Sequence, residues 1–171
     1  MNFSAKKTNR THNPVSPSTL HLERTDSRYM KMAFDLACRA AEEKEVPVGA
    51  VIVHENTVIA KAFNRIQSLK DPTAHAEMIA ITQACSSLGS KVLTNTVVYV
   101  TLEPCAMCAM AMVLAKIKRL VYATKDPLTG AAGSLYNIVR DTSLNHQLIV
   151  DQGLMQEESA ALLKNFFKDR R

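Results

Sequence analysis

The sequence predicts an α/β protein, a three-layer α/β/α sandwich with a central mixed five-stranded sheet. Three observations favour this fold. A segment with helical periodicity lies near each end of the chain. Two short β-strand patterns form a hairpin after the first of these helices. Further along, two β-branched segments are separated by one helix. Strands spaced in this last way are typically parallel and joined by a crossover helix. With 171 residues and 47% hydrophobic residues, the chain is long enough for one domain with a core.

The N-terminal residues 1–25 are predicted to be a flexible basic tail, and residues 26–171 to form the domain. The tail is rich in proline, hydroxyl and basic residues and holds one acid, Glu23, so it has little apolar surface to bury. The first helix is expected to begin at Asp26 or Ser27, because either residue can cap it. Its apolar positions then recur every three or four residues from Met30.

The middle of the chain alternates strands and helices. Residues 50–54 and 57–63 are predicted to form a hairpin, and residues 64–71 a loop. Asp71 or Thr73 is expected to cap the next helix, which places His75 and Glu77 in its first turn.

The second half continues this alternation with a β-branched strand over residues 96–101 and a helix from Cys105 to Ala115. The remaining predicted elements are a strand over 119–124, a loop over 125–134, a fifth strand over 147–150 and a final helix over 155–167. No apolar run approaches the ~20 residues that a membrane span needs, so no membrane association is expected.

Two short motifs carry the chemistry: His75-Ala76-Glu77 and Pro104-Cys105-Ala106-Met107-Cys108. Either motif alone is a weak signal. Together they offer one histidine and two cysteines, and three protein ligands with an open fourth position are typical of catalytic zinc. Both motifs stand at predicted helix N-termini, where the thiolate form of cysteine is favoured. Glu77 is placed to act on a zinc-bound water, and one zinc ion per subunit is expected.

Other interpretations of these residues are less favoured. A structural zinc site needs a fourth ligand, and the one spare candidate in mid-chain, Cys85, lies ~15 Å along the helix from His75 at 1.5 Å per residue. A redox Cys-x-x-Cys pair leaves His75 and Glu77 unexplained. A first-turn glutamate is most often a surface or capping carboxylate, but the neighbouring ligands argue against that for Glu77.

The paired motifs form the signature of the zinc-dependent nucleobase deaminases. Over residues 26–171 the chain resembles the bacterial tRNA adenosine deaminase family, with similar stretches at residues 45–51, 64–65, 71–77, 99–105, 129–134 and 161–167. The resemblance implies a cytidine-deaminase-like fold and a cytoplasmic homodimer. It also implies conversion of the wobble adenosine to inosine in a tRNA anticodon stem-loop, typically of an arginine tRNA.

Carried over residue by residue, the resemblance makes His75, Cys105 and Cys108 the zinc ligands and Glu77 the proton shuttle. Further positions are implied to contact the RNA or to wall the pocket: Val48, Asn64, Ala76, Asp126, Phe166, Phe167 and Arg170.

Among these, Asn64 is implied to contact the flipped nucleoside, Val48 and Ala76 to belong to the pocket wall, and Asp126 to meet the RNA backbone. The two phenylalanines and Arg170 belong to a helix that borders the anticodon loop. Plainer interpretations exist for several positions: Asn64 and Asp126 as turn residues, the two phenylalanines as core residues, and the cationic end as a solvated helix end. Met110 departs from the glycine common in the family at that position.

Two alternatives remain open. The same zinc and glutamate serve deaminases of free guanine, cytosine or nucleosides; the excess of 21 basic over 16 acidic residues and the cationic final helix favour RNA over these. The second alternative is a non-catalytic zinc-binding RNA module. Glu77 argues against it, because a scaffold has no need of that carboxylate.

Overall fold

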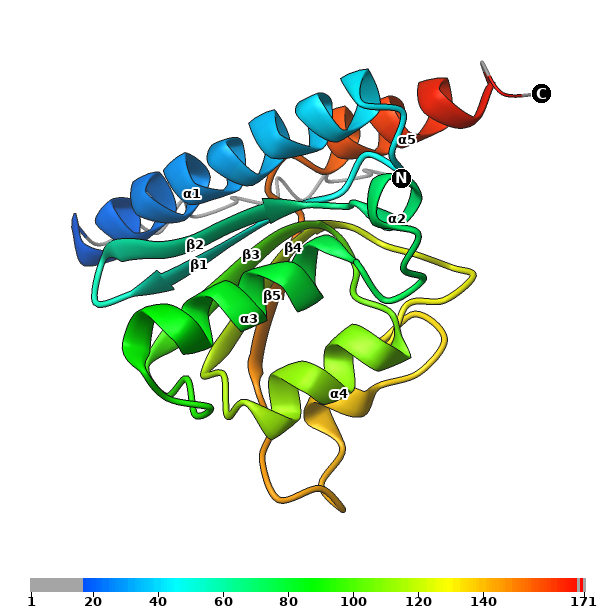
Figure 1. Cartoon of the computed structure of the whole chain (residues 1–171). Helices are drawn as coiled ribbons and strands as arrows, with labels where there is room; N and C mark the ends of the chain where they lie inside the picture. The colour runs from blue at the N-terminus through cyan, green and yellow to red at the C-terminus, as the bar shows by residue number, and fades with distance from the viewer. Residues whose placement is uncertain (1–16, 169, 171) are drawn as a thin grey trace, which may run out of the picture.

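A computed structural model describes residues 17–168 and 170. Within them the chain forms one mixed five-stranded sheet in the order β2-β1-β3-β4-β5 (Figure 1). The first strand in the chain pairs antiparallel with both of its neighbours, and the last three strands run parallel to one another. The strands are β1 (Gly49–His54), β2 (Thr57–Phe63), β3 (Thr96–Leu102), β4 (Arg119–Thr124) and β5 (Ile149–Gln152).

Helices cover both faces of this sheet, which confirms the predicted three-layer sandwich (Figure 1). One face carries α1 (Pro17–Glu42) and α5 (Gln156–Lys168), and the other carries α3 (Ala76–Leu88) and α4 (Ala106–Leu114). The larger apolar core lies on the α3 and α4 side and the smaller one on the α1 side. A helix α2 (Ile66–Leu69) and a 3-10 helix, η1 (Ile138–Arg140), are short.

The first helix starts earlier than predicted. It begins at Pro17, and proline is well tolerated in the first turn of a helix. Asp26 does not cap it: the Asp26 carboxylate accepts hydrogen bonds from the Tyr99 hydroxyl at 2.6 Å and from the Arg119 guanidinium at 2.7 and 2.9 Å. Residues 17–25 are therefore helical, and the rest of the predicted tail, residues 1–16, lies outside the described residues.

Close packing of α1 on the sheet explains one glycine. A Cβ atom on Gly49 would lie 2.1 Å from the carbonyl oxygen of Ala33 and 2.7 Å from the backbone nitrogen of Ala37. Only glycine allows this approach, so the first residue of β1 fixes how near α1 can lie.

Three further expectations were wrong in detail. The predicted loop 64–71 contains α2, and the fifth strand occupies Ile149–Gln152 rather than 147–150, since it pairs in parallel with residues 119–122 of β4. Neither Asp71 nor Thr73 caps α3. Asp71 instead accepts hydrogen bonds from the Thr73 N–H and hydroxyl in the preceding turn, and the N-cap position belongs to His75.

No helix in the described part of the chain is both long enough and apolar enough to cross a bilayer. Met110 is half-buried and packs against the larger core.

The helices α3 and α4 begin near the carboxyl ends of β3 and β4. In open α/β sheets this edge is where ligands usually bind.

Candidate active site

The two metal-binding motifs occupy equivalent positions in the fold. His75 is the N-cap residue of α3 and Cys105 that of α4, both with extended backbone, at φ −70° and ψ 151° and φ −70° and ψ 174°. Neither side chain hydrogen-bonds the end of its own helix. Both are therefore free to point into the space between the two helix starts.

His75, Cys105 and Cys108 come together there with zinc-like spacing. The two sulfur atoms lie 3.7 Å apart, and the His75 Nδ1 atom lies 3.8 Å from Cys105 Sγ and 3.6 Å from Cys108 Sγ. A tetrahedral zinc ion with Zn–S of about 2.3 Å and Zn–N of about 2.0–2.1 Å requires S–S of about 3.8 Å and N–S of about 3.6 Å. The donor set fits zinc.

The electrostatics of the cysteine pair suit metal ligation. The neighbouring Cys108 lowers the pKa of the Cys105 thiol to about 4 against the opposing effect of burial, and His75 adds to the lowering. The same contact and burial raise the pKa of Cys108. A thiolate is thus present at neutral pH, and zinc binding releases the second proton.

The remaining cysteines take no part in this cluster. Among the described residues, the group that can hold a metal contains His75, Cys105 and Cys108 without Cys85. All four cysteines are free thiols. The cluster offers three possible protein ligands, the number found in catalytic zinc sites, whereas structural zinc sites usually have four.

Glu77 lies one residue into α3 beyond the start of the helix and faces the same cavity as His75 and Cys105. Its side chain is almost fully buried, with 3% of its surface exposed. Burial raises the pKa of the Glu77 carboxyl above its ordinary value. A carboxyl group tuned in this direction is suited to both accepting and donating a proton.

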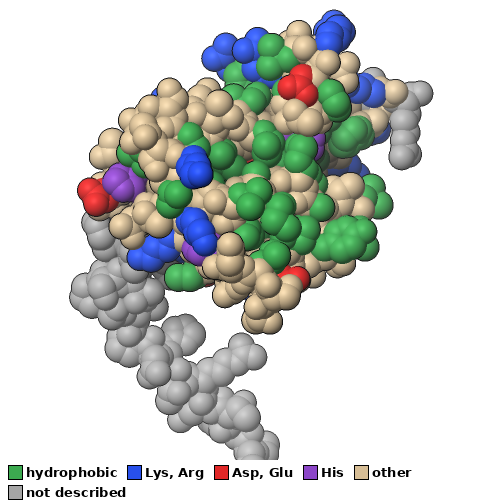
Figure 2. Space-filling model, turned by 60° about the horizontal axis from the view of Figure 1, so that its bottom comes forward, with side chains coloured by type: hydrophobic (Ala, Val, Ile, Leu, Met, Phe, Trp, Pro, Cys, Tyr) green, Lys and Arg blue, Asp and Glu red, His purple; other side chains and the backbone are tan. Residues whose placement is uncertain are grey.

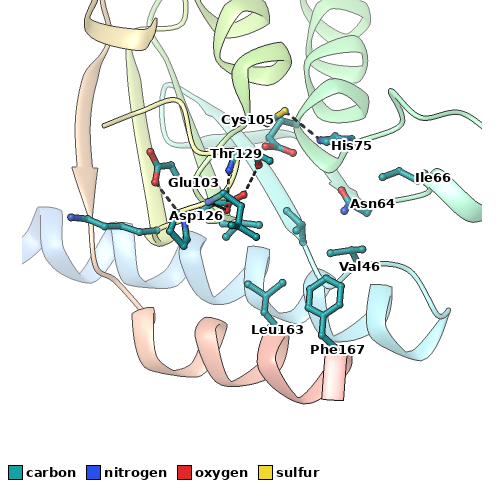
Figure 3. Close-up of a pocket in the computed structure, with 16 residues that line it drawn as sticks. Val46, Asn64, Ile66, His75, Glu103, Cys105, Asp126, Thr129, Leu163 and Phe167 are labelled. Atoms are coloured by element: carbon teal, nitrogen blue, oxygen red, sulfur yellow. Dashed lines mark hydrogen bonds between the residues drawn. The ribbon is translucent and has the colours of Figure 1, made fainter. Parts of the chain in front are cut away.

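A cavity of about 440 Å³ opens in front of this cluster (Figure 3). Ligand pockets commonly measure about 300–1,000 Å³, so there is room for a nucleobase and its ribose. Its lining comes from the loop before β1, the end of β2, α2, the loop after β4, and α5 (Figure 3). Beyond His75, Glu77 and Cys105, the lining residues are Val46, Val48, Asn64, Ile66, Leu102, Glu103, Lys125, Asp126, Pro127, Leu128, Thr129, Leu163 and Phe167.

Asn64 serves both the fold and the cavity. Its Oδ1 atom accepts a hydrogen bond from the Ala76 N–H at 2.8 Å, and its side chain is 4% exposed and lines the pocket. Because its oxygen is engaged, the side chain faces a ligand as a donor through Nδ2. Ala76 itself is fully buried behind the lining, whereas Val48 belongs to the pocket wall.

Asp126 lies in the loop after β4 and lines the cavity, and its carboxylate also folds that loop. It accepts hydrogen bonds from the N–H of Leu128 at 2.9 Å and of Thr129 at 3.2 Å, and from the Thr129 hydroxyl. The turn role and the pocket role therefore coexist in this residue.

The end of α5 divides its predicted residues between two places. Phe167 is 50% exposed and lines the cavity with Leu163 (Figure 3). Phe166 is half-buried outside the lining, where the Arg170 guanidinium lies 4.0 Å from its ring centroid. Arg170 also donates a hydrogen bond to the Lys44 carbonyl oxygen.

Sequence reasoning missed most of the apolar lining, including Val46, Ile66 and Leu128. These residues come from loops and from a one-turn helix that carry no periodic pattern. The sequence did hold a signal for Glu103. This glutamate stands at the end of a strand predicted to be buried, directly before Pro104 and Cys105, so its carboxylate is expected to lie away from solvent.

The sheet topology, the three-ligand cluster and the buried carboxylate beside it define a mononuclear zinc deaminase. The profile of the cytidine and deoxycytidylate deaminase zinc-binding region matches residues 23–124. The chain belongs to this family.

Individual proteins of known name or structure are also similar to this chain. The chain is 46% identical, over 84% of its length and 94% of the relative's, to a tRNA-specific adenosine deaminase of Aquifex aeolicus. A solved structure from a study of A-to-I editing by tRNA:A34 deaminases at the wobble position superposes with a TM-score of 0.78 at 43% identity, covering 80% of this chain and 99% of that one. A guanine deaminase of Bacillus subtilis reaches a TM-score of 0.55 at 39% identity, covering 57% and 63%.

Proposed function

We propose that this protein is a zinc-dependent tRNA adenosine deaminase that converts the wobble adenosine of an anticodon to inosine. The observation that carries the proposal is that Glu77, His75 and Cys105 line one nucleoside-sized cavity, with Cys108 completing the candidate metal cluster. Support also comes from the tRNA-specific adenosine deaminase that matches over most of both chains.

His75, Cys105 and Cys108 would hold the zinc ion. When bound, zinc supplies a Lewis acid that brings the pKa of water from 15.7 toward about 7. The Glu77 carboxylate would accept one proton of the attacking water and deliver it to the ring nitrogen of the adenine, while the water oxygen bonds to C6. Glu77 would then take the second proton from that oxygen and give it to the amino group as the C6–N bond breaks, so that adenosine and water give inosine and ammonia. Acid–base transfer of this kind contributes about 10²–10⁴ in rate.

The rest of the pocket orients the base. Asn64 donates a hydrogen bond from its Nδ2 atom to the flipped nucleoside, since its oxygen is held by Ala76. Val48 and Ile66 offer apolar surface to the base on one side of the cavity. Asp126, in the loop after β4, lines the cavity and would meet the RNA backbone next to the flipped nucleoside.

An RNA substrate fits this pocket better than a free base. The cavity rim carries the exposed residues Lys125, Leu128 and Phe167, which extend the binding surface beyond the volume of one base. Aromatic and cationic side chains of this kind bind the unpaired bases and phosphates of RNA loops. The reduced thiols and a tRNA substrate favour the cytoplasm.

The deciding experiment compares substrates. Inosine is measured in a synthetic arginine anticodon stem-loop with adenosine at the wobble position, with free guanine, cytosine and adenosine tested in parallel. The proposal expects conversion of the stem-loop alone. Conversion of guanine alone would favour the guanine deaminase alternative, which the partial similarity to the Bacillus subtilis enzyme motivates.

We further propose that the protein is a homodimer. Exposed apolar side chains lie on α4 and on the segment before η1, which packs against α4: Leu114 is 69%, Leu135 52% and Tyr136 56% exposed. Figure 2 shows hydrophobic side chains gathered on the face that α4 helps to form. Exposed apolar surface of this kind commonly marks a protein interface.

A further inference from the structure

Glu103 is a buried carboxylate whose hydrogen-bonding capacity is fully used. It lies directly after β3, is 2% exposed and borders the cavity (Figure 3). Its Oε1 atom accepts hydrogen bonds from the N–H of Ala132 at 2.9 Å and of Ser134 at 3.0 Å. Its Oε2 atom accepts from the N–H of Asp126 at 3.1 Å and from the Ser134 hydroxyl.

These four hydrogen bonds tie down both ends of one loop, residues 125–134. A carboxylate has about four lone-pair sites, so Glu103 has no acceptor left for a substrate or a water. It is therefore not a second proton shuttle. Glu103 instead fixes the backbone at Asp126 and the backbone that follows Thr129. Asp126 and Thr129 are loop residues that line the cavity.

The same loop is joined to the metal-binding segment. The Ala131 N–H donates to the Pro104 carbonyl oxygen at 2.8 Å, and Gly130 forms an isolated antiparallel bridge with Cys105. A Cβ atom on Gly130 would lie 2.4 Å from the Asp126 carbonyl oxygen and 2.6 Å from the Glu103 carboxyl carbon. The loop thus closes directly over the carboxylate, with no room for a side chain between them.

We propose that Glu103 is a positioning residue that sets substrate affinity, by holding the loop of Asp126 and Thr129 at a fixed distance from the catalytic cluster. This inference rests on the proposed function for its substrate. An amide in place of the carboxylate turns one acceptor into a donor that faces backbone N–H groups. The loop would then leave its position, while the zinc ligands, which sit on helix starts, would stay.

Kinetics on the stem-loop test the inference with the whole zinc-loaded protein. Glu103→Gln is expected to raise KM by roughly 10- to 100-fold, the effect of losing a charged hydrogen-bond network, with kcat within about threefold and full zinc content. Ser134→Ala removes only one of the four hydrogen bonds, so a smaller rise in KM is expected, and this variant serves if Glu103→Gln does not fold.

Asp26→Asn is the matched control. Asp26 is also a buried carboxylate with several hydrogen bonds, to Tyr99 and Arg119, but it lies outside the cavity lining. Its substitution is expected to lower thermal stability and leave KM unchanged. Three results for Glu103→Gln would overturn the inference: an unchanged KM, a fall in kcat as large as the rise in KM, or a loss of zinc.

Amide hydrogen exchange separates this inference from the proposed function. In Glu103→Gln the amides of Asp126, Ala132 and Ser134 are expected to exchange faster than in the wild type. The exchange rates of the Gln67 and Ser68 amides, which donate hydrogen bonds to the Glu45 carboxylate instead, should not change. Unchanged exchange in the loop contradicts the positioning role whatever the substrate. If the wild type converts a free base instead of the stem-loop, the proposed function fails and the KM ratio is measured on that base.

Discussion

The side-chain oxygen of Asn64 accepts a hydrogen bond from the backbone N–H of Ala76 at 2.8 Å. This contact joins the end of β2 to the first residue of α3, whose N-cap residue His75 does not cap the helix with its own side chain. A metal-ligand side chain cannot also serve as a cap. Asn64 therefore satisfies the free helix N–H from outside, and keeps its amide nitrogen for the pocket.

Two substitutions at Asn64 should separate these roles. Asn64→Asp keeps the acceptor for Ala76 but loses the donor, so we expect near-native thermal stability with KM for the stem-loop raised about tenfold or more. Asn64→Ala also leaves a buried N–H unpaired, which should lower the free energy of unfolding by about 1–3 kcal/mol. Urea denaturation and steady-state kinetics measure the two effects. Equal stability of the two variants would contradict the capping role.

Metal removal should abolish activity reversibly. Chelation of the zinc is expected to stop inosine formation, and added zinc to restore it. Cys105→Ser should lose the metal as measured by elemental analysis, because it removes one of three protein ligands. Cys85→Ser, a half-buried thiol outside the cluster, is the control and should keep one zinc per subunit. A fully loaded and active Cys105→Ser protein would refute the ligand assignment.

Glu45 predicts a pH-dependent contribution to stability. It is 1% exposed, and its carboxylate accepts hydrogen bonds from the N–H of Gln67 at 3.0 Å and of Ser68 at 2.7 Å. Burial opposes ionisation, but these hydrogen bonds outweigh it and lower the pKa of Glu45. A lowered folded-state pKa gives stability that is present above the unfolded value of about 4.3 and is lost as the pH falls through the folded value.

Glu45→Gln should therefore destabilise the protein at pH 7 by about 1.5–3 kcal/mol, the contribution of hydrogen bonds to a charged group. The difference should shrink as the pH falls below the unfolded-state value of about 4.3 toward the lowered folded-state pKa of Glu45, where the native carboxyl becomes protonated. Urea titrations of both proteins at several pH values measure it. A difference that stays constant down to pH 3 would show that the charge of Glu45 contributes nothing.

The proposed dimer surface can be tested by a single charge. Leu114→Glu should shift the protein toward monomers in light scattering, because a buried unpaired carboxylate opposes association. The folded subunit should tolerate the change, since Leu114 is 69% exposed. Leu69→Glu, at a 50% exposed leucine on α2, is the control and should keep the wild-type mass. A wild-type protein that is monomeric at all concentrations would contradict the proposal.

The sequence predicted the structure well where residues follow a hydrophobic period or form a motif. The hairpin, the parallel pair of β3 and β4, and the helix starts at the two metal motifs all followed from such patterns. Tertiary contacts decided the rest. Asp26 has the chemistry of a helix cap, yet it lies inside α1 and its carboxylate pairs with Arg119, far along the chain.

The walls of the site were the least predictable part. Glu45 and Glu103 hold loops through backbone N–H groups, and a backbone donor carries no residue-specific signal in a sequence. For the same reason the apolar lining from Val46, Ile66 and Leu128 became visible only in three dimensions. The chemical groups of a site can be predicted from motifs, whereas the loops that shape it depend on long-range contacts.

The most direct test of the account is the activity of Glu77→Gln on a wobble-adenosine stem-loop. The amide keeps the size of the buried side chain but cannot carry a proton. The predicted result is full zinc content, stem-loop affinity close to that of the wild type, and single-turnover inosine formation slowed by about 10²–10⁴. Inosine formation at the wild-type rate by this variant would contradict the role of Glu77, and with it the mechanism proposed for the site.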